Sequence, residues 1–304
     1  MSGRQEQDLQ REKWIEEKLK GQPQLLKDYM ISAKRKTSST RKAYLGYLMQ
    51  FVNFMGKQKV ELTKVKPMHI DRYVDYISKD NGTSIVNTKL AAVSDFYDFL
   101  VKNEFVKSNP CSSDMKLKGE KSDTVVFMTD KEVELIKKKV TCGKHASRNL
   151  CIITLGCATG LRVSAIRNID IEDIDFDKKT IHVIEKGNKK RDVYIGDNTI
   201  GVIQSWMKDR EKIYGTSTGP LFMSQKKNRL SVRTIEEMIH TASDGIDKHI
   251  TPHKMRSTCA MRLYDKTGDI YLTAQQLGHA SIANTMIYAK ATEDRRREAA
   301  NLLD

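Results

Sequence analysis

Six residues in the second half of this 304-residue chain could together act on a phosphate ester. They are two arginines, a lysine, two histidines and a tyrosine, namely Arg162, Lys186, His253, Arg256, His279 and Tyr288. So many potential cations cannot all be core residues, because buried charge is costly unless a strong anion offsets it. A phosphodiester is such an anion, and the phenol of Tyr288 is then the natural nucleophile. The set predicts cleavage and rejoining of a DNA strand by a tyrosine.

Attack by a phenol on a phosphodiester makes three demands on an enzyme that works without a metal. The nonbridging oxygens gain negative charge and need cations that are already in place. The leaving sugar hydroxyl needs a proton donor, and the nucleophile must be aligned opposite it. The phenol itself is a weak acid, with an ordinary pKa of about 10.

The arginines suit the first demand, because a guanidinium can hold two phosphate oxygens at once. Arg162 follows Gly160 and is expected at the start of a helix, although on its own it could be an ordinary surface arginine. His253 and Arg256 are three residues apart on a helix expected to begin at Pro252, so they share one face.

Lys186 lies at the predicted turn of a hairpin with the sequence VIEKGNKKRDVYI. An ammonium group there could protonate the leaving hydroxyl. Lys189, Lys190 and Arg191 crowd the same turn, so a solvated basic loop is the alternative, and position alone does not single out Lys186.

His279 and Tyr288 are nine residues apart, and a turn after Gly278 would bring their side chains close together. An isolated tyrosine is more often a core residue than a nucleophile. Tyr264 and Tyr271 are nearby competitors, but neither has this sequence context.

Composition agrees with a polyanionic partner. The chain has a formal net charge of +14, and 30% of its residues are charged, which suits neutralisation of phosphates. A basic surface without a partner is the alternative from charge alone. No long apolar run favours a membrane, and the polar start has no signal peptide. Five cysteines without CxxC spacing indicate reduced thiols in a cytoplasmic protein and no zinc site.

Apolar periodicity predicts a mainly α fold in two domains. Residues 1–21 form an extension that is helical or frayed, and residues 22–108 contain four short helices. The second of these is expected to start with a cap at Ser38, Ser39 or Thr40 and to stop at Gly56. Residues 109–123 read as a linker. Residues 124–304 form a mostly helical domain with a small three-stranded antiparallel sheet, whose first helix has a capping box at Thr129 and Glu132.

The order and spacing of four segments resemble the catalytic domain of tyrosine recombinases, the phage integrase family of lambda-integrase and Xer type. The segments are ATGLRVSAI, EKGNKKRDV, TPHKMRST and QQLGHASIANTMIYAKA. The helical region that ends in FYDFLVKNEFVKSNPC resembles the SAM-like core-binding domain of the same family. The resemblance covers nearly the whole chain from Gln22.

The resemblance implies a role for each of the six residues. Arg162, Arg256 and His279 would hold the nonbridging oxygens, and His253 would assist proton transfer. Lys186 would be the general acid, and Tyr288 would form a 3′-phosphotyrosyl bond that stores the ester energy, so that neither a metal nor another cofactor is needed.

Two positions depart from the family pattern. The family often has an acid three residues after the first arginine, where this chain has Ala165, and a histidine where this chain has Ser257. We interpret the missing carboxylate as a group that supports the active site rather than one that reacts.

The family resemblance also implies partners. Its members clamp double-stranded DNA between two domains and form a homo-tetramer on two DNA sites. The segment after the tyrosine docks on a neighbouring subunit, and here Ala299, Ala300, Leu302 and Leu303 could form the docking face. A helix packed on its own domain is the alternative.

Three functions remain open from the sequence. A site-specific DNA recombinase, acting in integration, excision or dimer resolution, is the leading interpretation. A type IB topoisomerase uses nearly the same residues to relax supercoiled DNA as a monomer, and a DNA-binding protein without catalysis is the third possibility.

Overall fold

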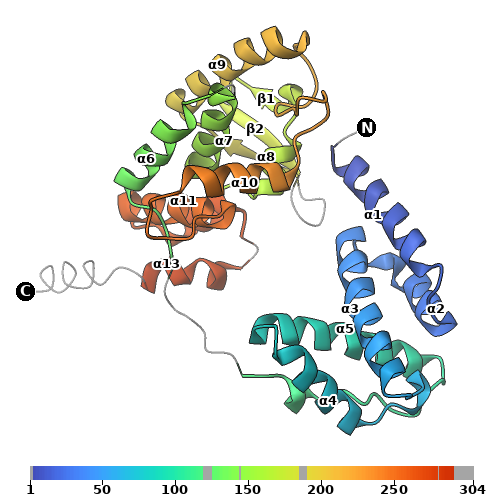
Figure 1. Cartoon of the computed structure of the whole chain (residues 1–304). Helices are drawn as coiled ribbons and strands as arrows, with labels where there is room; N and C mark the ends of the chain where they lie inside the picture. Colours follow the sequence, from blue (N-terminus) through green and yellow to red (C-terminus); the bar gives the residue numbers. More distant parts are fainter. Residues whose placement is uncertain (1–2, 119–124, 144, 185–189, 280, 291–304) are drawn as a thin grey trace, which may run out of the picture. The chain divides into compact units, whose positions relative to one another are not determined.

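The computed structural model describes residues 3–118, 125–143, 145–184, 190–279 and 281–290. The chain divides into two compact units, Met1–Lys121 and Ser122–Asp304 (Figure 1). Each unit has an apolar core of its own, so each is described by itself. The mainly helical fold that the sequence predicts is confirmed.

The first unit is helical and has no strand among its described residues, 3–118. Its α-helices are α1 (Gly3–Leu19), α2 (Gln24–Ser32), α3 (Ser38–Lys57), α4 (Pro67–Ser78) and α5 (Thr83–Lys102). Aromatic side chains form much of the core, where the rings of Phe51 and Tyr73 meet edge to face at 5.0 Å between centroids. Burial of each large apolar side chain contributes about 2 kcal/mol, which holds these amphipathic helices together.

Helix α1 packs against α3. Ile15 is buried, and the Arg41 guanidinium donates to both carboxylate oxygens of Glu12 at 2.6 Å. The ammonium of Lys42 lies 4.9 Å from the ring centre of Trp14. The N-terminal extension is therefore a helix attached to the first unit, although its Leu9 remains exposed.

Helix α3 differs from its expected ends. Thr37 is the N-cap, and its hydroxyl accepts from the Thr40 amide at 3.3 Å. A cap needs extended backbone, which Thr37 has, whereas Ser38–Thr40 are already helical. The expected cap at Ser38, Ser39 or Thr40 and the expected stop at Gly56 are both wrong, because the helix continues to Lys57.

Part of the expected linker lies on the first unit. The Leu117 amide donates to the Asn87 side chain, which in turn donates to the Leu117 carbonyl, both at 2.9 Å. Cys111 and Met115 pack against the same core. Residues 119–123 of the expected linker lie outside the described part of the chain.

The second unit combines helices with a three-stranded sheet of order β1-β2-β3. Its helices and strands are α6 (Asp130–Val140), α7 (Ala146–Thr159), α8 (Val163–Asn168), β1 (Ile174–Asp175), β2 (Thr180–Ile184), β3 (Lys190–Tyr194), α9 (Asp197–Tyr214), α10 (Val232–Ala242), α11 (Pro252–Thr267), α12 (Ile270–Leu277) and α13 (Met286–Lys290). Both strand pairs are antiparallel, with Ile181 opposite Ile174 on one side and Val193 on the other.

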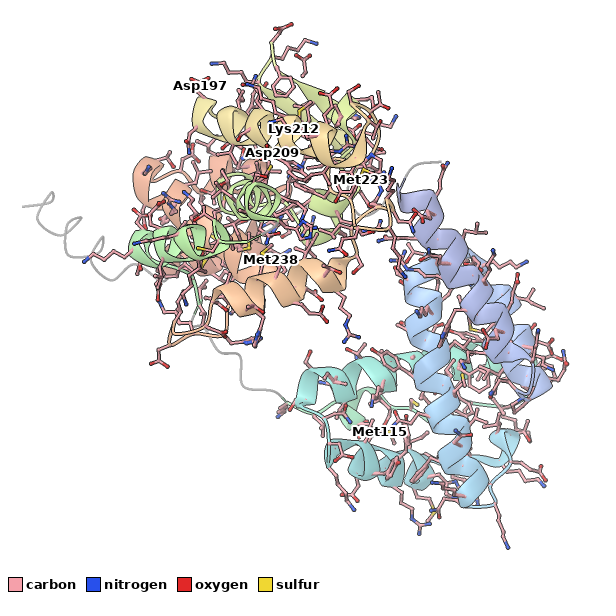
Figure 2. All side chains as sticks on the ribbon, turned by 45° about the horizontal axis from the view of Figure 1, so that its top comes forward. Met115, Asp197, Asp209, Lys212, Met223 and Met238 are labelled. Atoms are coloured by element: carbon pink, nitrogen blue, oxygen red, sulfur yellow. The ribbon has the colours of Figure 1, made fainter. Side chains whose placement is uncertain are left out.

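Helix α7 is the centre of this unit. It contacts α6, α8, α9, α10 and α11 (Figure 1). It is apolar over much of its surface, and most of its residues from Cys151 to Thr159 are buried, which suits a central helix. Helix α9 lies against it with a polar outer side that carries Asp197, Asp209 and Lys212 (Figure 2).

Short-range chemistry sets the helix ends that matter for the site. The capping box at Thr129 and Glu132 forms as predicted, with Thr129 N to the Glu132 carboxylate at 2.7 Å. Thr251 caps α11 just before Pro252, and Asp269 caps α12. The described helices include none with the length and apolar content needed to cross a bilayer.

Candidate active site

Helix α11 presents His253 and Arg256 from its first turns. Thr251 accepts from the Lys254 amide, and Pro252 occupies the first helical position, where its missing amide proton is no loss. His253 is exposed, whereas Arg256 points inward and is only 3% exposed. The two residues therefore share a helix face but occupy different depths.

The buried guanidinium of Arg256 joins two other helices. Its Nη1 donates to the Gly160 carbonyl and its Nη2 to the Leu277 carbonyl, each at 2.7 Å. Gly160 ends α7, and Leu277 is the last residue of α12. Carbonyls at a helix C-terminus lack partners within the helix and carry partial negative charge, so a cation there is favourable.

Both of these helices end at a glycine in the left-handed region. Gly160 has φ +63°, and Gly278 has φ +66°. A Cβ at Gly160 would also lie 2.6 Å from the Leu277 Cδ2 atom, so glycine is needed there for packing as well as for conformation. Arg162 and His279 follow these two glycines within two residues, and Arg256 therefore fixes the backbone next to both.

Arg162 is the N-cap residue of α8 and is exposed. The preceding Leu161 is buried, which anchors the short turn between α7 and α8. This location agrees with the expectation that Arg162 begins a helix, and it leaves the guanidinium at the surface near α11.

Electrostatics place three cations around His253. Its pKa is lowered from the ordinary value, first by partial desolvation and then by the charges of Arg256, Lys254 and Arg162. The residue is exposed by area, yet neighbouring protein atoms still remove part of the water around its imidazole. His253 is therefore neutral at neutral pH and can accept a proton.

His279 is held by Thr285. The His279 Nδ1 and the Thr285 Oγ1 atoms are 2.7 Å apart, and the His279 amide donates to the Ala274 carbonyl at 3.0 Å. These contacts hold the ring at Nδ1 and the backbone at the end of α12. Any contact of His279 with a phosphate oxygen would be made through Nε2.

Tyr288 lies on α13, with a side chain that is 2% exposed. It packs in a small cluster with Ala260 and Met261 of α11 and Leu277 of α12, bordered by Val125 and Phe127. Tyr288 is thus adjacent to α11, which carries His253 and Arg256, and to α12, which ends two residues before His279, and it packs among apolar side chains.

Lys186 lies outside the described residues. The base of its hairpin is described, and there the Arg191 guanidinium donates to the carbonyls of Gln275 and Gln276 at 3.4 and 3.1 Å. These carbonyls belong to the last turn of α12, next to the Leu277 carbonyl that Arg256 binds. The strand that leads out of the hairpin is therefore attached to the same helix end.

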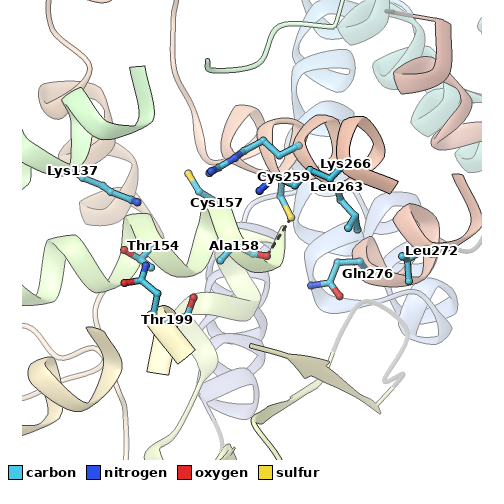
Figure 3. A pocket seen from close by; sticks show the side chains of 12 residues that line it. Lys137, Thr154, Cys157, Ala158, Thr199, Cys259, Leu263, Lys266, Leu272 and Gln276 are labelled. Carbon is cyan, nitrogen blue, oxygen red and sulfur yellow. Dashed lines mark hydrogen bonds between the residues drawn. The ribbon is translucent and has the colours of Figure 1, made fainter. Parts of the chain in front are cut away.

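Further contacts join α7, α11 and α12 behind the site. Cys259 of α11 donates through sulfur to the Ala158 carbonyl at 3.4 Å (Figure 3). Gln276 of α12 donates to the Thr159 carbonyl at 3.4 Å. All five cysteines are within the described residues and are free thiols.

Four of the six predicted residues are brought to one region by these contacts. Arg162, His253, Arg256 and His279 lie at or beside the ends of α7, α11 and α12, and Tyr288 packs behind them. Ala165, where the family often has an acid, is buried in the apolar core, and Ser257 is also buried. No three His, Cys, Asp or Glu side chains of the described residues are grouped so that they could bind a metal.

Sequence reasoning missed the residues that hold the others in place. The sequence identifies Gly160 only as the residue before the helix of Arg162 and includes Arg191 only in a basic turn, and it does not single out Thr285. An arginine next to a predicted hairpin gives no sign of the helix end it binds. The one available signal was the glycine that directly follows a buried helix, before Arg162.

We predict that His253 titrates below its ordinary pKa of 6.5 in the DNA-free chain, because partial desolvation and then the nearby cations disfavour its protonated form. Removal of one charge by Arg162→Gln should raise the midpoint. Arg233→Gln on α10 is the matched control, since Arg233 is exposed and is not among the charges that act on His253. NMR titration of the His253 ring proton, assigned with a His253→Gln variant, measures both shifts.

The lowered pKa of His253 also makes the stability of the folded chain depend on pH. A depressed histidine pKa stabilises the folded chain above pH 6.5, and this contribution is lost as pH falls through the folded-state pKa. A wild-type midpoint at or above 6.5 would contradict the arrangement of charges described here.

Relatives that resemble the chain over most of its length are tyrosine recombinases. The tyrosine recombinase XerC of Leptospira interrogans is 25% identical over 277 residues, covering 89% of each chain. The XerC of Pediococcus pentosaceus is 28% identical and covers 90% of this chain and 95% of its own.

Solved structures of the same kind share the fold. The XerA recombinase matches 91% of this chain with a TM-score of 0.53 and 26% identity. A lambda integrase dimer bound to a COC′ core site matches 88% of it with a TM-score of 0.71 and 16% identity.

Two family profiles cover both units. The phage integrase N-terminal SAM-like domain matches residues 24–104. The phage integrase family matches residues 126–295, more than half of the chain, and this range includes all six predicted residues. The chain therefore belongs to the phage integrase family and is a tyrosine recombinase.

Proposed function

We propose that the chain is a site-specific recombinase that cleaves and rejoins duplex DNA through a 3′-phosphotyrosyl bond at Tyr288. The observation that carries this proposal is the double contact of Arg256 with the carbonyls of Gly160 and Leu277. It fixes the backbone next to Arg162 and His279, and the charges of Arg256 and Arg162 act on His253. Together these residues would supply the donors that a pentavalent phosphate with extra negative charge requires.

Cleavage replaces the phosphate ester bond to the 5′ oxygen with an ester bond to Tyr288. The Tyr288 oxygen attacks phosphorus and gives up its proton, which neutral His253 is suited to accept. The bond from phosphorus to the 5′ oxygen breaks, and Lys186 gives that oxygen a proton, so a 5′-hydroxyl leaves. Arg162 and His279 hold the nonbridging oxygens, and Arg256, which is 3% exposed, joins them once the phosphate reaches its buried guanidinium. Attack by a 5′-hydroxyl from a second duplex reverses the steps and completes strand exchange.

The burial of Tyr288 adds a requirement to this proposal. Tyr288 as a whole residue is 2% exposed, so we infer that in-line attack on a bound phosphate requires the elements packed on it to move. Helix α13 has only five residues, Met286–Lys290, and contacts α11 and the short 3-10 turn Ile282–Asn284. We infer that the first step of cleavage is a shift of α13 that brings the phenol out of its apolar cluster.

The partner we propose is double-stranded DNA, bound by a homo-tetramer on two sites. The fold is similar to that of a lambda integrase whose structure is a tetramer bound to a Holliday junction, and this similarity supports the proposed arrangement. Residues 291–304 would dock on the adjacent subunit, and packing on the same domain is the alternative. These residues lie outside the described part of the chain.

Tyr288→Phe should abolish covalent attachment to DNA, because phenylalanine has no nucleophilic oxygen. The substrate is a library of randomised duplexes, each nicked so that the released strand end diffuses away and the adduct accumulates. The adduct is isolated under denaturing conditions, and its DNA is sequenced. Tyr264→Phe and Tyr271→Phe are controls in the same domain and should form the adduct at the wild-type level.

An adduct with Tyr288→Phe would remove Tyr288 as the nucleophile. Enrichment of one sequence, followed by recombinant junctions between two copies of it, is the expected result of a site-specific recombinase. Adducts spread over all sequences, with relaxation of supercoiled DNA and no junctions, would instead indicate a topoisomerase.

Lys186→Ala should slow cleavage by about a hundredfold, the usual contribution of a general acid. A substrate with sulfur in place of the 5′ oxygen should restore the rate, because a thiolate leaves without a proton. Lys190→Ala, at the start of β3, is the control and should show no rescue specific to sulfur. If the sulfur substrate is cleaved as slowly as the oxygen substrate by the Lys186→Ala chain, Lys186 is not the acid.

A further inference from the structure

Thr285 lies between two of the proposed active-site residues and contacts the elements of both. It is completely buried, and its hydroxyl oxygen is 2.7 Å from the His279 Nδ1 atom. Its carbonyl accepts from the Tyr288 amide at 3.0 Å, and its own amide donates to the Ile282 carbonyl at 2.7 Å. Thr285 therefore joins the imidazole of His279 to the first turn of α13.

The chemistry of the imidazole makes this contact significant. A neutral histidine has one ring nitrogen that donates and one that accepts, and the partner of one nitrogen decides the state of the other. A hydroxyl that donates to Nδ1 keeps the proton on Nε2. An Nε2 proton is what His279 needs in order to donate to a nonbridging phosphate oxygen.

Threonine is also suited to hold this geometry. Its β-branched side chain has restricted rotation about χ1, and the residue is fully buried. The backbone of Thr285 is fixed on both sides by the bonds to Ile282 and Tyr288. A displacement of α13 therefore also displaces the hydroxyl that orients His279.

We propose that Thr285 is a positioning residue, which holds His279 with its proton on Nε2 and links that state to the location of the helix that carries Tyr288. This role rests on the proposed function, because it assumes that His279 donates to the scissile phosphate. Thr285 does not touch the substrate. It acts through His279 and through α13.

The tautomer of His279 can be read directly in the full-length, DNA-free chain. Long-range ¹H–¹⁵N NMR at pH 8 distinguishes protonated Nε2 from protonated Nδ1. The wild type and Thr285→Ser should show the proton on Nε2, and Thr285→Val should show a mixture. Thr273→Val is the matched control, because Thr273 is equally buried on α12 and its hydroxyl donates to the Asp269 carbonyl at 2.8 Å.

Adduct formation on the selected duplex provides the second readout. Thr285→Val should slow it about tenfold, the effect of losing one hydrogen bond of about 1.4 kcal/mol. Thr285→Ser should recover most of the rate, and Thr273→Val should stay within about twofold of wild type. A slower Thr285→Val chain with an unchanged His279 tautomer would overturn the proposal and leave a merely structural role.

Two outcomes separate this inference from the proposed function. If the wild type forms no adduct on any duplex, the proposed function fails, while the NMR result still decides whether Thr285 sets the tautomer. If Thr285→Val does not fold, the wild-type spectrum decides by itself, since a proton on Nδ1 of His279 contradicts the proposal.

Discussion

The site depends on one buried guanidinium. Arg256 is 3% exposed and donates to the terminal carbonyls of α7 and α12. A buried charge is unfavourable unless it is hydrogen-bonded, and so is a carbonyl at a helix end that has no donor. The bonds between Arg256 and the two carbonyls satisfy both requirements. The same bonds fix the backbone that leads to Arg162 and to His279. A residue that sequence patterns present as a phosphate ligand is therefore also the main connection between three helices.

This arrangement concentrates like charge where a phosphodiester would bind. Partial desolvation and then the charges of Arg256, Lys254 and Arg162 disfavour the protonated form of His253, and a phosphate would relieve the repulsion between these charges. The proposed nucleophile differs, because Tyr288 packs among apolar side chains on a short helix. With the shift of α13 that we propose, the backbone next to Arg162 and His279 would already be held before the phenol reaches the phosphate. Such preorganisation lowers the barrier because little has to reorient during the reaction.

The sequence predicted what local rules determine. The start of α11 at Pro252, the capping box at Thr129 and the three-stranded sheet all follow from neighbouring residues and are confirmed. The N-cap of α3 was wrongly predicted among Ser38, Ser39 and Thr40, since only backbone angles show that the neighbouring Thr37 is the cap. The contacts of Arg256, Arg191 and Thr285 could not be predicted. Arg256 and Arg191 bind carbonyls that are distant along the chain and come close only when whole helices pack. The direction of the Thr285 side chain is likewise set by how its segment packs.

Amide hydrogen exchange in the DNA-free chain measures directly whether Arg256 holds the ends of α7 and α12 together. Arg256→Lys keeps the charge but cannot bind two carbonyls with a planar fork. If Arg256 limits local opening at these helix ends, the amides of Leu161 and His279 should exchange at least about tenfold faster in this variant. Arg262→Lys on the same helix, which alters a surface contact with Asp130, should leave both amides unchanged. A folded Arg256→Lys chain with wild-type exchange at both amides would contradict the account.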